Sequence, residues 1–264
     1  VPAMLARAKA KGIDHFHIFG EIAYEEPTAT LAAQVMAESQ LPYALDMGFA
    51  KAAQMVASGK SPPRLMAEFL QQDAIYPGGA KTALGLPTFL GNHDFGRFSM
   101  FVRQMSGSDE PETLLARVKL GHAMMFLLRG VPTVYYGDEQ GFISDGNDQL
   151  AREDMFESRV AVYNDNNLIG SDATTAQSNF DTNHPLYRQI AELARTPLGC
   201  QGDTLRIPLK RPPATATCAS SAPLARSPKR RCWSAASRAG GPTPACAPTP
   251  WRRRSWVRRW RRSG

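Results

Sequence analysis

The chain has 264 residues, of which 43% are apolar, and this is enough for one large domain or two smaller ones with a substantial core. The formal net charge of +7 arises at one end, because residues 211–264 hold 13 of the 31 Lys and Arg residues and none of the 24 acidic residues. Residues 1–210 therefore carry 18 basic against 24 acidic residues, which argues against a nucleic-acid-binding body, and no apolar run approaches membrane-spanning length.

Helix-like and strand-like segments alternate along the first 210 residues. We expect helices over 2–11, 30–39, 49–57, 63–74, 112–130 and 184–195, short strands over 14–20, 41–47, 86–91 and 131–137, and a polar loop over about 144–183. A strand followed by a helix, four times over, predicts an α/β fold with parallel strands and crossover helices. The strands are nearly all apolar, as expected for strands that are covered on both faces.

Polar side chains follow the C-terminal end of each predicted strand. They are Glu21, Asp46, the triplet Asn92-His93-Asp94, and Asp138-Glu139. In a (β/α)8 barrel this end of the strands forms the active site. Two carboxylates on either side of a sugar cleave a glycosidic bond, so Glu21 and Asp94 are candidate catalytic groups. By spacing alone, a solvated loop Glu and a turn-forming Asn-His-Asp explain these residues equally well.

At these residues the chain resembles the alpha-amylase family of retaining glycoside hydrolases. The segment FLGNHDFGRFS (89–99) resembles the strand-seven motif, HIFGEI (17–22) is similar to the strand-five motif that carries the general acid, and RGVPTVYYGDEQGF (129–142) resembles the strand-eight segment. The resemblance implies the C-terminal half of a (β/α)8 TIM barrel, strands five to eight, over residues 1–200. It also implies that the C-terminal β-domain begins, and is cut short, at 201–210.

The resemblance implies roles for five residues. Glu21 is the expected general acid/base, and Asp94 the third carboxylate, which holds sugar hydroxyls and stabilises an oxocarbenium-like transition state. His93 is expected to bind the same sugar, with Asn92 and Arg97 supporting the site. The implied substrate is an alpha-glucan or oligosaccharide. No metal or cofactor is expected in this chain, because the acidic loop at 144–156 lacks EF-hand spacing, and a calcium site stays open for the complete enzyme.

One part of the family pattern has no counterpart in this sequence. The nucleophile of the family is an Asp in a Gly-x-Arg-x-Asp type motif on strand four, whereas Asp14 and Asp46 lie in other contexts. The chain also opens on Val1 without an initiator Met, so we expect strands one to four to be encoded upstream. A retaining mechanism needs its nucleophile, and we expect this chain alone to have no normal hydrolase activity. Secreted, periplasmic and cytoplasmic locations all stay open.

The basic tail, residues 211–264, has a different composition from the rest. It is rich in Ala, Arg, Pro and Ser, and it holds all four Trp residues of the chain. We interpret it as a frameshift product without a folded core, which predicts disorder. The alternative interpretation is a non-catalytic protein that binds sugar, or single-stranded nucleic acid through its Arg and Trp side chains. A nucleic-acid partner is the less favoured of the two.

Overall fold

The structure is a computed structural model that describes residues 1–14 and 16–196. The predicted β-domain start at 201–210 and the basic tail at 211–264 lie outside the described residues, so both stay predictions.

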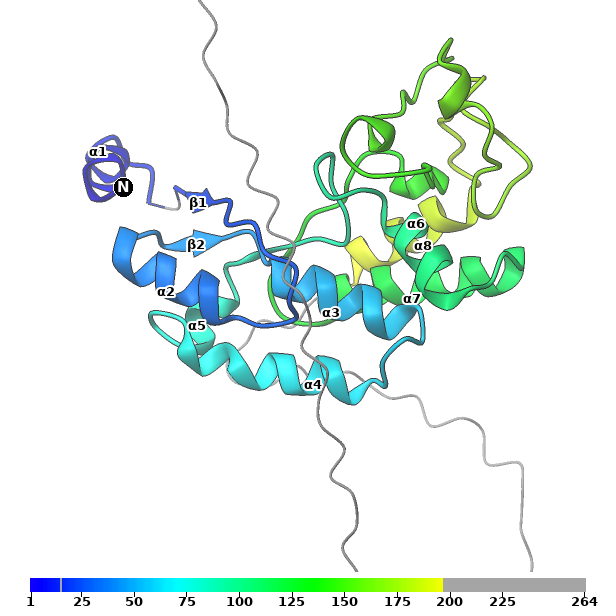
Figure 1. The fold of residues 1–264 in the computed structure, drawn as a ribbon. Helices are drawn as coiled ribbons and strands as arrows, with labels where there is room; N and C mark the ends of the chain where they lie inside the picture. The colour runs from blue at the N-terminus through cyan, green and yellow to red at the C-terminus, as the bar shows by residue number, and fades with distance from the viewer. Residues whose placement is uncertain (15, 197–264) are drawn as a thin grey trace, which may run out of the picture. The chain divides into compact units, whose positions relative to one another are not determined.

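The described residues form short strands that alternate with helices (Figure 1). The strands are β1 (Phe19–Gly20), β2 (Tyr43–Ala44), β3 (Pro87–Thr88) and β4 (Val131–Pro132). The α-helices are α1 (Pro2–Ala10), α2 (Thr30–Ser39), α3 (Met47–Ala57), α4 (Arg64–Leu70), α5 (Ala80–Ala83), α6 (Phe98–Ser106), α7 (Pro111–Leu127) and α8 (Pro185–Arg195). The 3-10 helices are η1 (Gln71–Ile75), η2 (Asp138–Gln140), η3 (Asp148–Ala151) and η4 (Ala161–Tyr163).

The strands pair in parallel, as the alternating pattern predicted. β1 pairs with β2 and β3 pairs with β4. The backbone N–H of Asp46 donates to the carbonyl of Pro87 at 3.0 Å, which joins the two pairs at one point. Each strand is only two residues long, much shorter than expected. For β2 and β3 the reason is local: Asp46 already caps α3, and the chain after β3 turns back on itself at Asn92.

The helices agree with the predicted positions except in three places. The helix expected at 63–74 is divided into α4 and η1, and neither the short helix α5 nor α6 was predicted. The sequence around α6 does hold a helix signal, since Phe98 and Val102 are four residues apart and both fully buried, and Gly107 ends the helix in the left-handed region. The residue before the helix, Arg97, makes no side-chain cap, so the usual start signal is missing.

The core lies between the strands and helices α3, α6 and α7. Fully buried aromatic rings from α3, α4 and α6 fill it, among them Phe49, Phe69 and Phe98. Helices α6 and α7 come very close, because a Cβ atom at Gly121 would lie 2.2 Å from the ring of Phe98. Glycine is therefore required at this crossing. Among the described residues, no helix is long and apolar enough to cross a membrane.

The predicted polar loop at 144–183 is confirmed as a region without strands or α-helices. Buried side chains hold its backbone instead. Thr175 donates to the carbonyl of Tyr163, and Asn179 donates to the carbonyls of Thr174 at 3.1 Å and Gln177 at 2.7 Å. This loop therefore has a defined path, because side-chain hydrogen bonds replace the missing ladder bonds.

Candidate active site

Glu21 follows β1 directly and is exposed. Its preceding residue, Gly20, accepts a backbone hydrogen bond from Leu45 at 2.9 Å, which places the strand end beside β2. None of the hydrogen bonds or ion pairs found within residues 1–14 and 16–196 involves the Glu21 side chain. The carboxylate is thus presented to solvent at the end of a parallel strand.

Asp46, at the end of β2, has a different environment. Its side chain is fully buried, it accepts a hydrogen bond from the N–H of Phe49 at 3.0 Å, and it pairs with Arg129. Arg129 also contacts Asp73 at 2.7 Å. Burial raises the pKa of Asp46, and the Arg129 guanidinium opposes this effect. The structure therefore uses Asp46 as a helix cap and buried anchor, and it does not contribute to an open site.

Asp94 lies on the turn that follows β3. The side chain of Asn92 accepts hydrogen bonds from the N–H groups of Asp94 at 3.0 Å and Phe95 at 2.8 Å, and the backbones of Asn92 and Gly96 exchange two further bonds. This Asx turn leaves His93 and Asp94 exposed, with the His93 Nε2 atom 3.3 Å from a carboxylate oxygen of Asp94. The Asn-His-Asp triplet thus forms a turn that displays a carboxylate and an imidazole together.

Arg97, which the resemblance expects to support the site, lies in the interior beneath the turn. The side chain has no exposed surface. It donates to Glu153 at 2.9 Å and to the carbonyl of Tyr136, and its guanidinium carbon lies 4.3 Å from the centre of the Tyr135 ring. In this structure Arg97 can support the turn that holds Asp94, three residues before it in the sequence, but it has no surface with which to contact a ligand.

Asp138, after β4, is buried beside the same arginine. One of its carboxylate oxygens lies 3.6 Å from Arg97, and the other lies 4.0 Å from His122 Nε2. Burial raises the pKa of Asp138 to about 7, against the opposing charge of Arg97. Burial likewise lowers the pKa of His122 to about 4. By its position in the sequence Asp138 belongs with the other strand-end carboxylates, but in the fold its side chain is buried.

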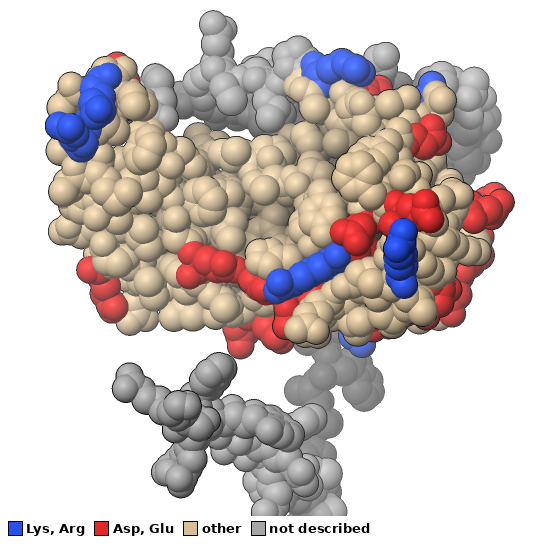
Figure 2. Space-filling model, turned by 90° about the horizontal axis from the view of Figure 1, so that it is seen from above, with Lys and Arg blue, Asp and Glu red and all other residues tan. Residues whose placement is uncertain are grey.

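Asp94 is also in contact with the polar loop. Its carboxylate lies 3.3 Å from a terminal nitrogen of Arg152, and the same nitrogen contacts Asp148 at 2.6 Å. All three side chains are about half exposed, at 47%, 46% and 58% respectively. On the face of the molecule that Figure 2 shows, acidic and basic side chains lie next to each other in one band.

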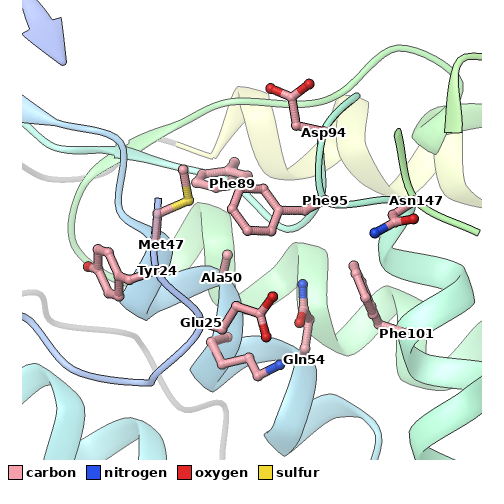
Figure 3. Close-up of a pocket in the computed structure, with 11 residues that line it drawn as sticks. Tyr24, Glu25, Met47, Ala50, Gln54, Phe89, Asp94, Phe95, Phe101 and Asn147 are labelled. Carbon is pink, nitrogen blue, oxygen red and sulfur yellow. The ribbon is translucent and has the colours of Figure 1, made fainter. Parts of the chain in front are cut away.

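A pocket of about 220 Å³ opens beside Asp94. Aromatic rings line part of it, and Glu25, Lys51 and Gln54 supply polar groups. Figure 3 shows Asp94 at the rim, with its carboxylate pointing away from Glu25 and Gln54. Rings and hydrogen-bonding groups together suit a ligand with both apolar faces and hydroxyl groups. Glu21 is not part of this lining, whereas Glu25, which belongs to none of the motifs, is.

No metal site was found within residues 1–14 and 16–196: they hold no group of three or more His, Cys, Asp and Glu side chains that could bind a metal ion. The acidic loop at 144–156 uses its carboxylates in ion pairs instead, Asp145 with Arg103 at 3.7 Å and Asp148 with Arg152.

Comparison with known proteins gives a consistent result. A family model described as the alpha amylase catalytic domain matches residues 3–193. A curated alpha-amylase of Streptomyces lividans is 42% identical over 192 residues, which are 73% of this chain and 21% of the relative. The chain thus spans about a fifth of that relative's length.

Solved structures show the same fold. An Anoxybacillus alpha-amylase aligns with a TM-score of 0.50 at 21% identity, over 72% of this chain and 34% of its own. A cyclomaltodextrin glucanotransferase with a three-domain ABC distribution aligns with a TM-score of 0.50 at 20% identity, over 73% and 33%. At these identities the likeness shows the fold alone, an α/β fold of the TIM-barrel type that the matched family shares.

Proposed function

The chain belongs to the alpha-amylase family, as its motifs predicted, and on this premise we propose that it forms the part of a retaining glycoside hydrolase that carries the general acid/base Glu21 and the third carboxylate Asp94. The proposed substrates are alpha-glucans or their oligosaccharides. Glu21 protonates the glycosidic oxygen and later activates water, while Asp94 holds sugar hydroxyls and stabilises positive charge at the ring.

One observation carries this proposal. Of the five carboxylates that follow the strands or stand next to them, Asp46 and Asp138 are buried beside arginines, whereas Glu21 and Asp94 are exposed. The fifth, Glu139, is half-buried and accepts a hydrogen bond from the N–H of Gly137 at 2.9 Å. Only an exposed carboxylate at the strand ends can reach a sugar. Asp94 also lines a pocket with aromatic walls, which suits the apolar face of a pyranose ring.

The neighbours of Asp94 take supporting roles in this proposal. His93 is exposed next to Asp94 and donates to the same sugar. Asn92 holds the turn through its two hydrogen bonds to the backbone. Arg97 acts as a positioning residue from beneath the turn, because it is buried and bound to Glu153.

The covalent step needs a nucleophile that the sequence of this chain does not offer in the expected motif. We therefore propose that another segment of the complete enzyme supplies the nucleophilic Asp, and that the chain of 264 residues alone does not hydrolyse glucans.

Substitutions in the complete enzyme test the two assignments. We expect Glu21→Gln and Asp94→Asn each to lower the turnover of a maltooligosaccharide by at least about a thousandfold, because each removes a group that acts in the transition state. Glu26→Gln is the matched control, since Glu26 is exposed on the same loop and is not among the residues that line the pocket. If Glu25→Gln abolishes turnover and Glu21→Gln does not, the general acid is Glu25.

A further inference from the structure

We propose that Arg152 is a positioning residue that sets the orientation of the Asp94 carboxylate, and that the buried pair of Arg97 and Glu153 anchors it. The inference rests on the proposed function in one respect, the role of Asp94. The inference adds Arg152, a residue of the polar loop, to the residues that act on Asp94. It also assigns buried Arg97 the role of anchoring Arg152 through Glu153.

Asp94 and Arg152 lie on two turns that contact each other. The first is the turn after β3, residues 92–97, and the second is the segment 148–153, which includes η3. Their backbones are joined directly, since the N–H of Asp148 donates to the carbonyl of Asp94 at 3.3 Å. The Arg152 Nε atom also donates to the carbonyl of His93 at 3.4 Å. Arg152 thus contacts both the backbone and the side chain of the triplet.

The two ion pairs between the turns have opposite polarity: in one the acidic residue lies on the first turn, and in the other it lies on the second. Asp94 on the first turn pairs with Arg152 on the second at 3.3 Å, and Arg97 on the first pairs with Glu153 on the second at 2.9 Å. Arg152 and Glu153 are adjacent in sequence, yet one is half exposed and the other buried. A shift that moved Asp94 next to Glu153, or Arg97 next to Arg152, would bring like charges together, so the reciprocal pairs favour the observed register.

The buried pair provides the fixed reference. Arg97 and Glu153 have side-chain exposures of 0% and 4%, and the rings of Tyr135 and Phe142 lie 4.3 Å and 5.0 Å from the Arg97 guanidinium carbon. A charge in such a place cannot leave its partner without a large cost. Glu153 is therefore held, and the backbone of its neighbour Arg152 is held with it.

The exposed pair has a different effect. An ion pair open to water contributes little to stability. Arg152 instead restricts the direction of the Asp94 carboxylate, because Asp148 holds the same nitrogen of Arg152 at 2.6 Å. A carboxylate that is already oriented binds sugar hydroxyls without a further loss of rotamer freedom.

The test uses the 264-residue chain and two measurements. The first is the χ1 rotamer distribution of Asp94 by NMR scalar couplings, without ligand. The second is the affinity for maltotriose by titration calorimetry. The variants are Arg152→Gln, Arg152→Lys, Asp94→Asn and the double variant. Arg103→Gln is the matched control, because Arg103 is partly exposed and pairs with Asp145 of the same loop without contacting Asp94.

We expect Arg152→Gln to broaden the Asp94 rotamer distribution and to weaken maltotriose binding about fivefold, Arg152→Lys to restore part of both, and Arg103→Gln to change neither. In the Asp94→Asn background, Arg152→Gln should weaken binding no further. An unchanged Asp94 rotamer in Arg152→Gln overturns the proposal, and so does an equal loss of affinity in both backgrounds. If wild type does not bind maltotriose, the sugar site proposed around Asp94 in this chain fails, while the rotamer measurement still decides the role of Arg152.

Discussion

Two Asp–Arg pairs follow two successive strands of this molecule, and they differ in burial. The pair of Asp46 and Arg129 has side-chain exposures of 0% and 10%, whereas the pair of Asp94 and Arg152 has 47% and 46%. Arg129 satisfies a second carboxylate, Asp73, and a helix cap completes the first. Arg152 also contacts a second carboxylate, Asp148, but all of these groups remain accessible to water.

The comparison shows that the same two residue types serve different purposes at equivalent places. A buried ion pair must be complete, because a single charge left behind is strongly destabilising. An exposed ion pair can separate with little loss of folding stability, so its carboxylate remains available to a ligand. Burial therefore separates the structural carboxylate from the candidate catalytic one, although both follow strands of the same parallel arrangement.

The largest effect is expected from Arg129→Met. The substitution leaves Asp46 and Asp73 without their shared cation in a buried site, and we expect a loss of about 3–5 kcal/mol in the free energy of unfolding. Urea denaturation followed by far-UV circular dichroism measures this. Arg64→Met is the control, since Arg64 is 80% exposed in an i,i+4 pair with Glu68 and should change stability by less than about 0.5 kcal/mol.

A second substitution sharpens the interpretation. Adding Asp46→Asn to Arg129→Met removes the uncompensated carboxylate, while the Asn side chain can still accept a hydrogen bond from the N–H of Phe49. We expect the double variant to recover about 1–2 kcal/mol of the loss. A double variant less stable than Arg129→Met alone would contradict the view that the buried charge is the main cost.

The pH dependence of stability tests the buried carboxylate Asp138. Its pKa is about 7 in the folded protein, above the ordinary value of 3.8, so the folded state binds more protons than the unfolded state between pH 4 and 7. This group therefore makes the protein less stable as pH rises through that range. His122 acts in the opposite sense, because its folded pKa of about 4 lies below 6.5 and stability is lost as pH falls.

Asp138→Asn separates these two effects. We expect the stability of the variant relative to wild type to increase by about 2–4 kcal/mol between pH 4 and pH 7, since only the wild type carries the unfavourable carboxylate. Urea denaturation at both pH values gives the difference. Asp148→Asn, at a 58% exposed position, should show no comparable change. A pH-independent difference for Asp138→Asn would mean that this carboxyl titrates normally.

The smallest effect on stability is expected at the exposed pair. Arg152→Gln should lower the free energy of unfolding by less than about 1 kcal/mol, because water solvates the partners that it leaves. Thermal unfolding of the variant beside Arg129→Met gives the comparison in one experiment. A loss as large as that of Arg129→Met would show that both pairs are structural, and the distinction between the two strand ends would fail.

The order of the elements could be read from the sequence because it depends on local patterns. Gly107 and Gly130 take positive φ angles at the ends of helical or turn segments, and apolar runs mark β3 and β4. The lengths of the strands could not be read in this way. Apolar residues continue through 89–90, but the side chain of Asn92 bends the chain there by binding two backbone N–H groups.

For the candidate site, the motifs by themselves determined the family and predicted the residues Glu21, Asn92, His93 and Asp94, because these residues follow short apolar runs in the order of the family motifs. Only the tertiary structure decided which charged residues face water. Arg97 lies in the same motif as Asp94, yet Glu153 and Asp138, distant in sequence, draw it into the interior. The burial of a charge depends on partners that the fold brings together from separate segments, and no local pattern records them.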